Sequence, residues 1–337
     1  MVAVCLTIDV ECSIGGAFAN RHLIPQIDAP VWCRINGKSH GLGFILDTLA
    51  RHRLIATFFV ETNHVHHFGL APMQVAIDQI VAGGHAIELH AHPCWSVFQY
   101  PDWRDRCSSP QLDNFAAITQ ANAVEVIQAG IAAFEHWNLP RPTVFRSGNL
   151  EHEAHLYDAL AHCEIPYSSS IGLGICSSGK SQYRLFSGQH RLRHTTEIPI
   201  TSFEDWAIVG KRRLKSLTIA GTTFSETVSL LFSAERQAVS TIVLLTHPFE
   251  FVHKKDVRYS NLRPNQTNQL RFKKLCAFLD EHRSTFPAVT VARAAVEADD
   301  ALLNRNVVLR TSFIQSLGRR VSNQVDTRLG MLSTAFN

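Results

Sequence analysis

The sequence predicts an α/β fold in which parallel strands, separated by helices, close into a barrel. Short apolar runs of strand length alternate with segments of helical periodicity along most of the chain, and this alternation is typical of a parallel sheet. The apolar runs suit strands that are buried on both faces. About eight such strands favour closure into a barrel over an open sheet. In folds of this kind, function gathers at the carboxyl ends of the strands.

The expected elements follow one another in a regular order. Strands are expected at AVCLTID (3–9), ATFFVE (56–61), HAIELH (85–90), PTVFRS (142–147), PYSSSI (166–171), TEIPIT (196–201), STIVLLTH (240–247) and AVTVAR (288–293). Helices are expected over residues 41–54, 71–84, 112–137, 152–165, 224–237 and 266–283. Gly83 and Gly84 supply a natural end for the second of these helices.

The composition is that of a soluble globular protein. Apolar residues make up 45% of the 337 residues and charged residues 18%, and the net charge of +3 does not suggest a nucleic-acid partner. No apolar run reaches the roughly 18 residues of a membrane span. The eight cysteines are scattered without a CxxC pair, so neither a zinc ribbon nor a disulfide framework is indicated. The amino terminus lacks the features of a secretory signal, and we expect a cytoplasmic protein.

One domain is expected over residues 1–298, followed by an extension over 299–337 that is basic and weakly amphipathic. Nothing in the composition before about residue 300 marks a linker. The ordinary interpretation of the extension is a solvated or packing helix. A helix that lies on a membrane surface or binds a partner is the alternative.

Two carboxylates and two histidines occupy the carboxyl ends of two expected strands. Because side chains alternate along a strand, Asp9 and Glu11 project to one side, and so do His90 and His92. Neighbouring carboxylates are costly unless a cation or a shared proton relieves them, although a solvent-facing strand end explains this pair equally well. Pro93 ends the third strand directly after its histidines. Two histidines at this spacing and position indicate a metal site.

Two further strands end in polar residues. Arg146 leaves the apolar run of its strand and must reach water or a carboxylate, for which a strand-end acid is the obvious partner. His247 ends the run STIVLLTH and is followed by a proline. Separate strand ends thus direct two acids, three histidines and an arginine toward one face, and this convergence is a stronger signal than any single motif.

Taken in order, these segments resemble the polysaccharide deacetylase family, which is also called the NodB homology or carbohydrate esterase family 4 group. LTIDVE is similar to the family's first motif, ATFFVE to its second-strand signature, GHAIELHAHP to its histidine motif and IVLLTHP to its closing Leu-x-His motif, while FRSG stands where Arg-x-Pro-Tyr is usual. The resemblance covers about residues 1–295 and leaves the extension outside.

The resemblance implies a distorted (β/α) barrel of about seven or eight strands, one divalent metal ion and hydrolysis of an N-acetyl or related acyl group on a sugar. It also implies a role for each of seven residues. Asp9 matches the catalytic base, Arg146 the arginine that steadies it, His247 the general acid, Ser147 the backbone N–H that stabilises the oxyanion, and Glu11, His90 and His92 the metal ligands.

Two departures from the family pattern affect the metal ligands. Val10 stands where the family has its metal-binding aspartate, so Glu11 is the available substitute in an Asp-Val-Glu form of the motif. Cys94 stands where the second metal histidine is usual, four residues after His90. His92 is the closer chemical match, and ligation by the Cys94 thiolate is the alternative.

The expected cofactor is one Zn²⁺ ion, with Co²⁺, Ni²⁺ or Mn²⁺ as alternatives, because two imidazoles and a carboxylate suit these metals and leave positions for water and the acyl oxygen. The expected substrate is an acylated sugar of surface-glycan or glycoconjugate synthesis. A cytoplasmic location favours a nucleotide-linked or lipid-linked precursor over an assembled polymer. If the precursor is lipid-linked, the basic extension has a use in peripheral contact with the inner membrane surface.

Two other functions remain open on the sequence. The Val10 and Cys94 departures are compatible with a catalytically silent barrel that binds a glycan or a lipid-linked sugar, but the presence of all four catalytic matches argues against it. Another metal-dependent amidohydrolase barrel is the second alternative. Such barrels carry His-x-His on the first strand, where this chain has Asp9 and Glu11.

Overall fold

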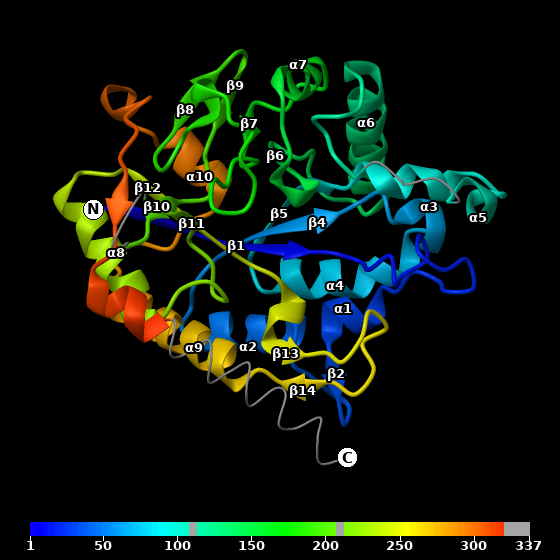
Figure 1. Cartoon of the computed structure of the whole chain (residues 1–337), viewed down its shortest axis with the longest axis horizontal. Helices are drawn as coiled ribbons and strands as arrows, with labels where there is room; N and C mark the ends of the chain where they lie inside the picture. Colours follow the sequence, from blue (N-terminus) through cyan, green and yellow to red (C-terminus); the bar gives the residue numbers. More distant parts are fainter. Residues whose placement is uncertain (108–112, 207–211, 320–337) are drawn as a thin grey trace.

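The computed structural model describes residues 1–107, 113–206 and 212–319 and places them in an α/β fold built on one curled sheet (Figure 1). The sheet has the strand order β12 (Thr241–Thr246), β1 (Ala3–Val10), β4 (Thr57–Glu61), β5 (Ala86–Ala91), β6 (Val144–Ser147), β7 (Tyr167–Ser168), β9 (Thr195–Glu197) and β8 (His190–Leu192). Neighbouring strands are parallel except for β8, which is antiparallel to β9. The expected barrel-like α/β fold is confirmed.

Segments outside the eight strands bring the two sides of the curled sheet together. The Thr201 N–H donates to the Val243 carbonyl at 3.0 Å, and Ile219 donates to the carbonyl of Leu245 at 3.2 Å. The segment that contains Thr201 comes directly after β9, and at its start the Ile198 N–H donates to the carbonyl of Ser168 in β7 at 2.7 Å. These bonds connect the edge strand β12 to the β7–β9 side, as a distorted barrel requires.

Helices surround the sheet, as Figure 1 shows. They are α1 (Asp28–Trp32), α2 (Leu42–Arg51), α3 (Val65–Phe68), α4 (Ala71–Ala82), α5 (Trp103–Arg106), α6 (Gln120–His136), α7 (Ala154–His162), α8 (Phe224–Arg236), α9 (Gln266–Glu281) and α10 (Val291–Val296). Short 3₁₀ turns are η1 (Pro93–Gln99), η2 (Gly148–Leu150), η3 (Ser181–Tyr183), η4 (Pro248–Phe251) and η5 (Asp300–Leu302). The minor strands are β2 (Arg34–Ile35) with β3 (Lys38–Ser39), β13 (Val252–His253) with β14 (Arg263–Pro264), and β11 (Leu214–Ser216), β10 (Ser202–Glu204) and β15 (Leu309–Arg310) in one small sheet.

The two faces of the main sheet bury different sets of side chains. Val4, Leu6 and Ile8 of β1 belong to the large apolar cluster that the surrounding helices cover. Cys5 of the same strand belongs to a second, smaller cluster together with Phe59 and Val243. Since side chains alternate along a strand, Asp9 shares the face of Cys5. The apolar filling of the inner face therefore gives way to polar side chains toward the carboxyl ends of the strands.

Two expected elements differ from the structure. The strand expected at 288–293 is wrong: only Ala288 makes an isolated bridge with Val4, and the chain then enters α10. The Thr290 side chain caps that helix by accepting from the Arg293 N–H, which a hydroxyl before an alanine-rich segment does well. The long helix expected from residue 112 begins only at Gln120, where Thr119 is the capping residue.

The described part of the carboxyl-terminal extension packs against the barrel. Strand β15 pairs in parallel with β10, and the buried Arg319 forms ion pairs with Asp205 and Glu226. Residues 320–337 of the expected extension lie outside the described residues, and the boundary at 298 stays a prediction. Within the described ranges, no helix is long and apolar enough to cross a membrane.

Candidate active site

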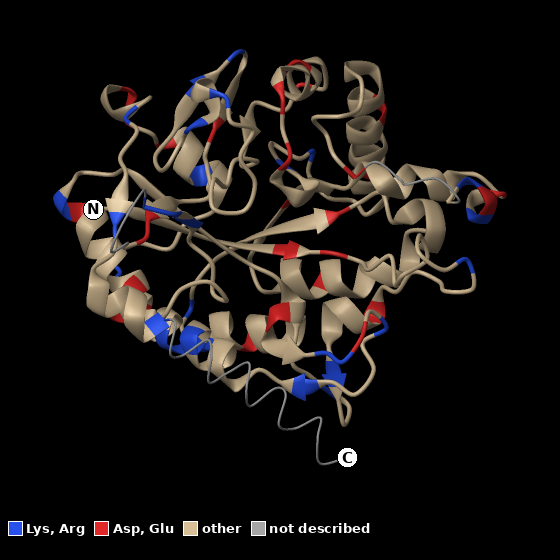
Figure 2. Cartoon of the chain, in the orientation of Figure 1, with Lys and Arg blue, Asp and Glu red and all other residues tan. Residues whose placement is uncertain are grey.

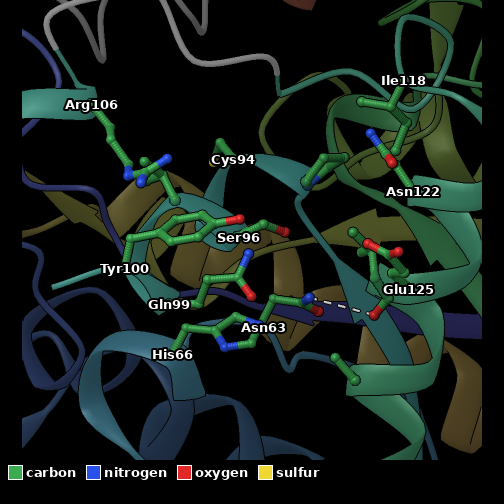
Figure 3. Close-up of a pocket in the computed structure, with 14 residues that line it drawn as sticks. Asn63, His66, Cys94, Ser96, Gln99, Tyr100, Arg106, Ile118, Asn122 and Glu125 are labelled. Carbon is green, nitrogen blue, oxygen red and sulfur yellow. Dashed lines mark hydrogen bonds between the residues drawn. The ribbon is translucent and has the colours of Figure 1, made fainter. Parts of the chain in front are cut away.

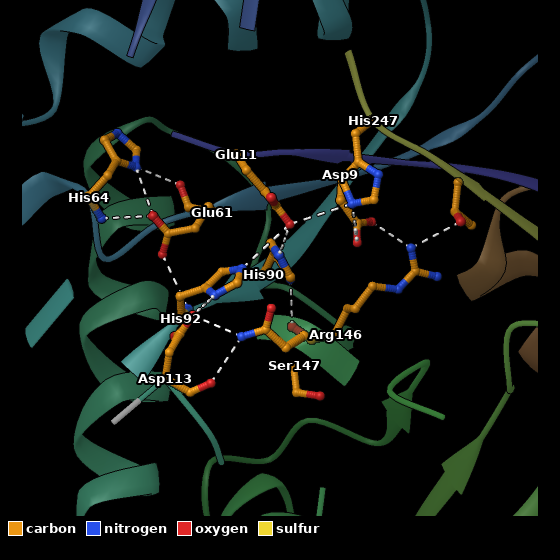
Figure 4. Close-up of polar contacts among 12 residues, drawn as sticks. Asp9, Glu11, Glu61, His64, His90, His92, Asp113, Arg146, Ser147 and His247 are labelled. Atoms are coloured by element: carbon orange, nitrogen blue, oxygen red, sulfur yellow. Dashed lines mark hydrogen bonds and ion pairs between the residues drawn. The ribbon is translucent and has the colours of Figure 1, made fainter. Parts of the chain in front are cut away.

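All seven site residues expected from the sequence lie at or just after the carboxyl ends of β1, β5, β6 and β12 (Figure 4). The strand register explains why they meet: Ile8 of β1 lies beside Thr246 of β12, and His90 of β5 lies beside Arg146 of β6. Because the strands are parallel and end at similar heights, the residues that follow them face a common space.

Asp9 and Arg146 form a buried ion pair. Arg146 Nη1 donates to Asp9 Oδ1 at 2.6 Å and to Thr7 Oγ1 at 3.0 Å. Arg146 Nε and Nη2 donate to the carbonyl and hydroxyl of Ser169 at 3.0 and 2.9 Å, and the guanidinium lies over the Phe59 ring at 3.9 Å. Both residues are at most 2% exposed. The arginine is therefore held by several partners and in turn fixes the orientation of the carboxylate.

Three imidazoles surround the carboxylate of Glu11. Its Oε1 lies 3.0 Å from His90 Nε2, 3.4 Å from His92 Nε2 and 3.6 Å from His247 Nε2. His247 Nε2 also lies 3.9 Å from Asp9 Oδ2. Within the described residues, two groups of three side chains could hold a metal ion, Glu11 with His90 and His92, and Asp9 with Glu11 and His247.

The other ring nitrogen of each imidazole has an acceptor. His90 Nδ1 lies 2.9 Å from the Arg146 carbonyl, His92 Nδ1 lies 2.8 Å from Asp113 Oδ2, and His247 Nδ1 lies 3.0 Å from Glu250 Oε1. An acceptor at Nδ1 places the proton of a neutral imidazole there, which leaves a lone pair at Nε2. Three such lone pairs facing one carboxylate oxygen repel it unless a cation or extra protons lie between them. The donor set and its outer acceptors thus fit a bound divalent cation.

The pKa shifts of Glu11, His92 and His247 also indicate that positive charge is favoured at this cluster. Burial acts to raise the pKa of Glu11, but His247, His90 and His92 together hold it well below its ordinary value. Burial acts to lower the pKa of His92, but Asp113 and Glu11 raise it well above its ordinary value. For His247, the carboxylates of Glu11, Glu250 and Asp9 outweigh burial and raise the pKa to about 9. Without a metal ion, protons on His92 and His247 balance the carboxylates.

His92, and not Cys94, is brought to Glu11. The metal-ligand groups around Glu11 include His92 but not the thiol, and the Cys94 N–H lies 3.5 Å from Asp113. Burial, together with the carboxylates of Asp113 and Glu61, raises the pKa of the Cys94 thiol well above its ordinary value. Because only a thiolate binds zinc strongly, this environment disfavours Cys94 as a ligand.

Ser147 is placed differently from its expected role. Its backbone N–H donates to Ser170 Oγ at 3.1 Å, so in this structure it is not free to donate to a substrate oxygen. Its hydroxyl is buried without a partner among the described residues, and Figure 4 shows the side chain pointing away from Glu11. Service as an oxyanion donor would require the bond to Ser170 to open.

Three carboxylates next to the site were not predicted from the sequence. Asp113 and Glu250 accept from His92 and His247. Glu61, fully buried, accepts from the backbone N–H groups of Asn63 and His64 at 2.8 and 2.9 Å. A carboxylate three residues after a histidine was a readable signal for Glu250, and the end of an expected strand was one for Glu61. No local pattern pointed to Asp113.

A separate pocket of about 520 Å³ lies between η1 and α6 (Figure 3). Asn63, Gln99 and Tyr100 line it, together with Pro93 and Cys94, which follow His92 in the chain. None of the seven expected site residues lines this pocket, so it is distinct from the cluster around Glu11.

Comparisons with known proteins agree with the fold and the resemblance. Residues 37–168 match the family model described as polysaccharide deacetylase, a range that holds His90, His92 and Arg146. A putative polysaccharide deacetylase from Mycobacterium smegmatis has the same fold, with 16% identity, a TM-score of 0.53, and coverage of 93% of this chain and 95% of that chain. A family 4 carbohydrate esterase from Streptomyces lividans in complex with acetate aligns at 13% identity with a TM-score of 0.41, covering 85% of this chain and 91% of that one. No protein with a curated description matches. Residues 37–168, which carry three of the clustered side chains, thus match the polysaccharide deacetylase family.

Proposed function

We propose that this protein is a metal-dependent hydrolase that removes an acyl group, an N-acetyl group in the first instance, from a sugar. The observation that carries the proposal is the convergence of three imidazole Nε2 atoms on Glu11 Oε1, beside the buried Asp9–Arg146 pair. One carboxylate and two imidazoles, each imidazole with an outer acceptor, are a common ligand set for catalytic zinc. Glu11, His90 and His92 would hold the ion, since Asp9 is already bound by Arg146.

When bound at these three residues, Zn²⁺, or Co²⁺, Ni²⁺ or Mn²⁺ in its place, supplies Lewis acidity toward the acyl group and the attacking water. The chain supplies the proton transfers. Asp9 accepts a proton from the water that adds to the acyl carbon, and Arg146 holds this carboxylate in place. His247 then gives a proton to the nitrogen as the carbon–nitrogen bond breaks. The neighbouring carboxylates of Glu250 and Asp9 act to raise the pKa of this ring and so favour its protonated form, and Glu250 accepts from its Nδ1.

An assay on the purified protein tests this proposal. We expect about one divalent ion for each chain and release of the free amine from N-acetylated sugars. Removal of the ion by a chelator should abolish release, and addition of Zn²⁺ or Co²⁺ should restore it. His92→Ala should weaken metal binding while Cys94→Ala leaves it unchanged. A metal-free protein that binds glycans but releases no amine would contradict the proposal and favour a silent binding barrel.

A basic hairpin next to the site supports a substrate that carries phosphate. The β13–β14 connection contains Lys254, Lys255 and Arg258 against one acid, Asp256, and Figure 2 shows basic residues on this side of the molecule. Lys254 Nζ lies over the rings of Tyr259 and Phe249 at 4.2 and 5.5 Å. The Phe249 ring stacks on His247 with 4.8 Å between centroids. A cation is thus separated from the candidate general acid by one ring.

This placement suits a sugar whose anomeric carbon bears a phosphate, as in a nucleotide-linked or lipid-linked precursor. Lys254→Gln should raise KM for an N-acetylated sugar phosphate and leave KM for the same sugar without phosphate unchanged. Lys38→Gln, on the exposed β2–β3 hairpin, is the control. Equal KM values for Lys254→Gln and wild type on the phosphorylated sugar would remove the support for such a substrate.

We also propose peripheral membrane contact through the carboxyl-terminal extension of a cytoplasmic protein. Phe313, Ile314 and Leu317 are exposed, and the extension is basic in sequence. Segments that combine apolar and basic residues bind anionic membrane surfaces. Ile314→Asp should lower sedimentation with anionic vesicles and not affect that with neutral ones. Unchanged sedimentation would contradict the contact, and cell fractionation tests the location.

A further inference from the structure

The imidazole of His92 is held by a carboxylate from outside the strands. Asp113 Oδ2 lies 2.8 Å from His92 Nδ1, and the Nε2 atom on the other side of the ring lies 3.4 Å from Glu11 Oε1. The ring thus bridges two carboxylates, one on each nitrogen, as Figure 4 shows. The His92 side chain is 12% exposed and that of Asp113 is 31% exposed. The contact is therefore partly shielded from water and is stronger than an exposed pair.

Asp113 is itself fixed by the segment that follows β6. Asn149 Nδ2 donates to Asp113 Oδ2 at 2.9 Å and to the Asp113 carbonyl at 3.0 Å. Asn149 adopts a left-handed backbone conformation with φ of 55°, which asparagine tolerates better than most residues. The preceding Gly148 lies against the His92 ring so closely that a Cβ atom there would be 2.4 Å from Nδ1. The ring is therefore confined by Gly148 and oriented by Asp113.

We propose that Asp113 is the positioning residue for His92, and that it fixes the ring so that Nε2 presents its lone pair beside Glu11 and His90. The inference rests on the proposed metal site. A carboxylate at Nδ1 selects the tautomer with the proton on Nδ1 and raises the basicity of Nε2 as a ligand. For His90, the Arg146 carbonyl is the acceptor that orients the ring at Nδ1. The two imidazoles thus differ in the charge of their outer partner, and His92 depends on a side chain that substitution can remove.

Metal affinity of the full-length protein tests the inference without use of the catalytic activity. The dissociation constant for Zn²⁺ is measured by competition with a chromophoric chelator for wild type, Asp113→Ala and Asp113→Asn. We expect Asp113→Ala to weaken binding by about 10–100-fold. Asp113→Asn should weaken it less, because an amide oxygen still accepts the Nδ1 proton but carries no charge. Asp102→Ala is the matched control, since Asp102 is an aspartate on a nearby segment that pairs with Arg106 and not with a histidine.

Unfolding of the metal-free variants separates a positioning role from a merely structural one. A positioning role predicts that Asp113→Asn unfolds like wild type without metal and still binds Zn²⁺ more weakly. If wild type and both Asp113 variants bind Zn²⁺ with dissociation constants within about twofold of each other, the inference is wrong and the proposed function stands. If wild type binds no divalent ion, both the proposed function and this inference are wrong.

Discussion

Replacement of Arg146 by methionine is the perturbation whose effect follows most directly from the packing around Asp9. The guanidinium makes an ion pair of 2.6 Å with Asp9 and further hydrogen bonds to Thr7 and Ser169. Methionine has a similar length and can lie on the Phe59 ring, so the cavity that it leaves is small. The main consequence of Arg146→Met is a buried carboxylate whose next cation is the His247 ring, 3.9 Å away.

The expected loss of stability is large. Removal of one partner from a buried ion pair costs about 3–5 kcal/mol, and acceptors left without their donors cost about 1 kcal/mol more, which gives about 4–6 kcal/mol in total. A second substitution, Asp9→Asn, removes the unpaired charge. The double variant should therefore be more stable than Arg146→Met alone by about 2–3 kcal/mol.

Urea unfolding of the metal-free protein at neutral pH measures these free energies. Arg141→Met is the control, because Arg141 lies just before the same strand and pairs at the surface with Glu164. Its side chain is 49% exposed, and such pairs contribute at most about 1 kcal/mol. The account of the Asp9–Arg146 pair is refuted if Arg146→Met loses no more stability than Arg141→Met, or if the double variant is no more stable than Arg146→Met.

Three further predictions follow from the site and the core. Gly148→Ala should weaken Zn²⁺ binding about tenfold or more in a chelator competition, because its Cβ would meet the His92 ring at 2.4 Å; Gly318→Ala, where a Cβ meets nothing within 4 Å, should have no effect, and equal losses in the two variants would contradict the steric argument. Zn²⁺ affinity should rise with pH, because the raised pKa of His92 means that the ion must displace a proton; calorimetry in two buffers of different ionisation enthalpy should show proton release, and pH-independent binding would disprove it. Burial raises the pKa of Glu88 from 4.5 to about 7, so the folded state binds this proton more tightly than the unfolded state, and the stability that Glu88 contributes is complete below about pH 4.5 and is lost as the pH rises through about 7. Glu88→Gln should remove that part of the pH dependence in urea unfolding, and an unchanged profile would show that Glu88 is not its source.

The strands of the main sheet were readable from the sequence because buried parallel strands are short apolar runs. The strand predicted at AVTVAR was wrong, because its apolar pattern is compatible with a strand and with the start of a helix. The Thr290 side chain caps a helix there. Closure of the sheet through Thr201 and Ile219 had no local signature. It depends on bonds to β12, which lies far along the chain.

The site was readable to the extent that it follows strand parity. Asp9 with Glu11, and His90 with His92, meet because residues two apart share a face, and the parallel register of β5 and β6 places Arg146 beside His90. Asp113 could not be predicted, since it reaches His92 from the residues that precede α6 and not from a strand end. The hydrogen bond from the Ser147 N–H to Ser170 could not be predicted either, because Ser170 follows a different strand.

In the proposed reaction, Asp9 is the base of hydrolysis at the cluster around Glu11. The most direct test is the rate of amine release from an N-acetylated sugar by Zn²⁺-loaded wild type and Zn²⁺-loaded Asp9→Asn. Wild type should release the amine, and Asp9→Asn should be slower by about 10²–10⁴-fold while it still binds Zn²⁺. Release by Asp9→Asn at the rate of wild type would contradict the proposed role of Asp9.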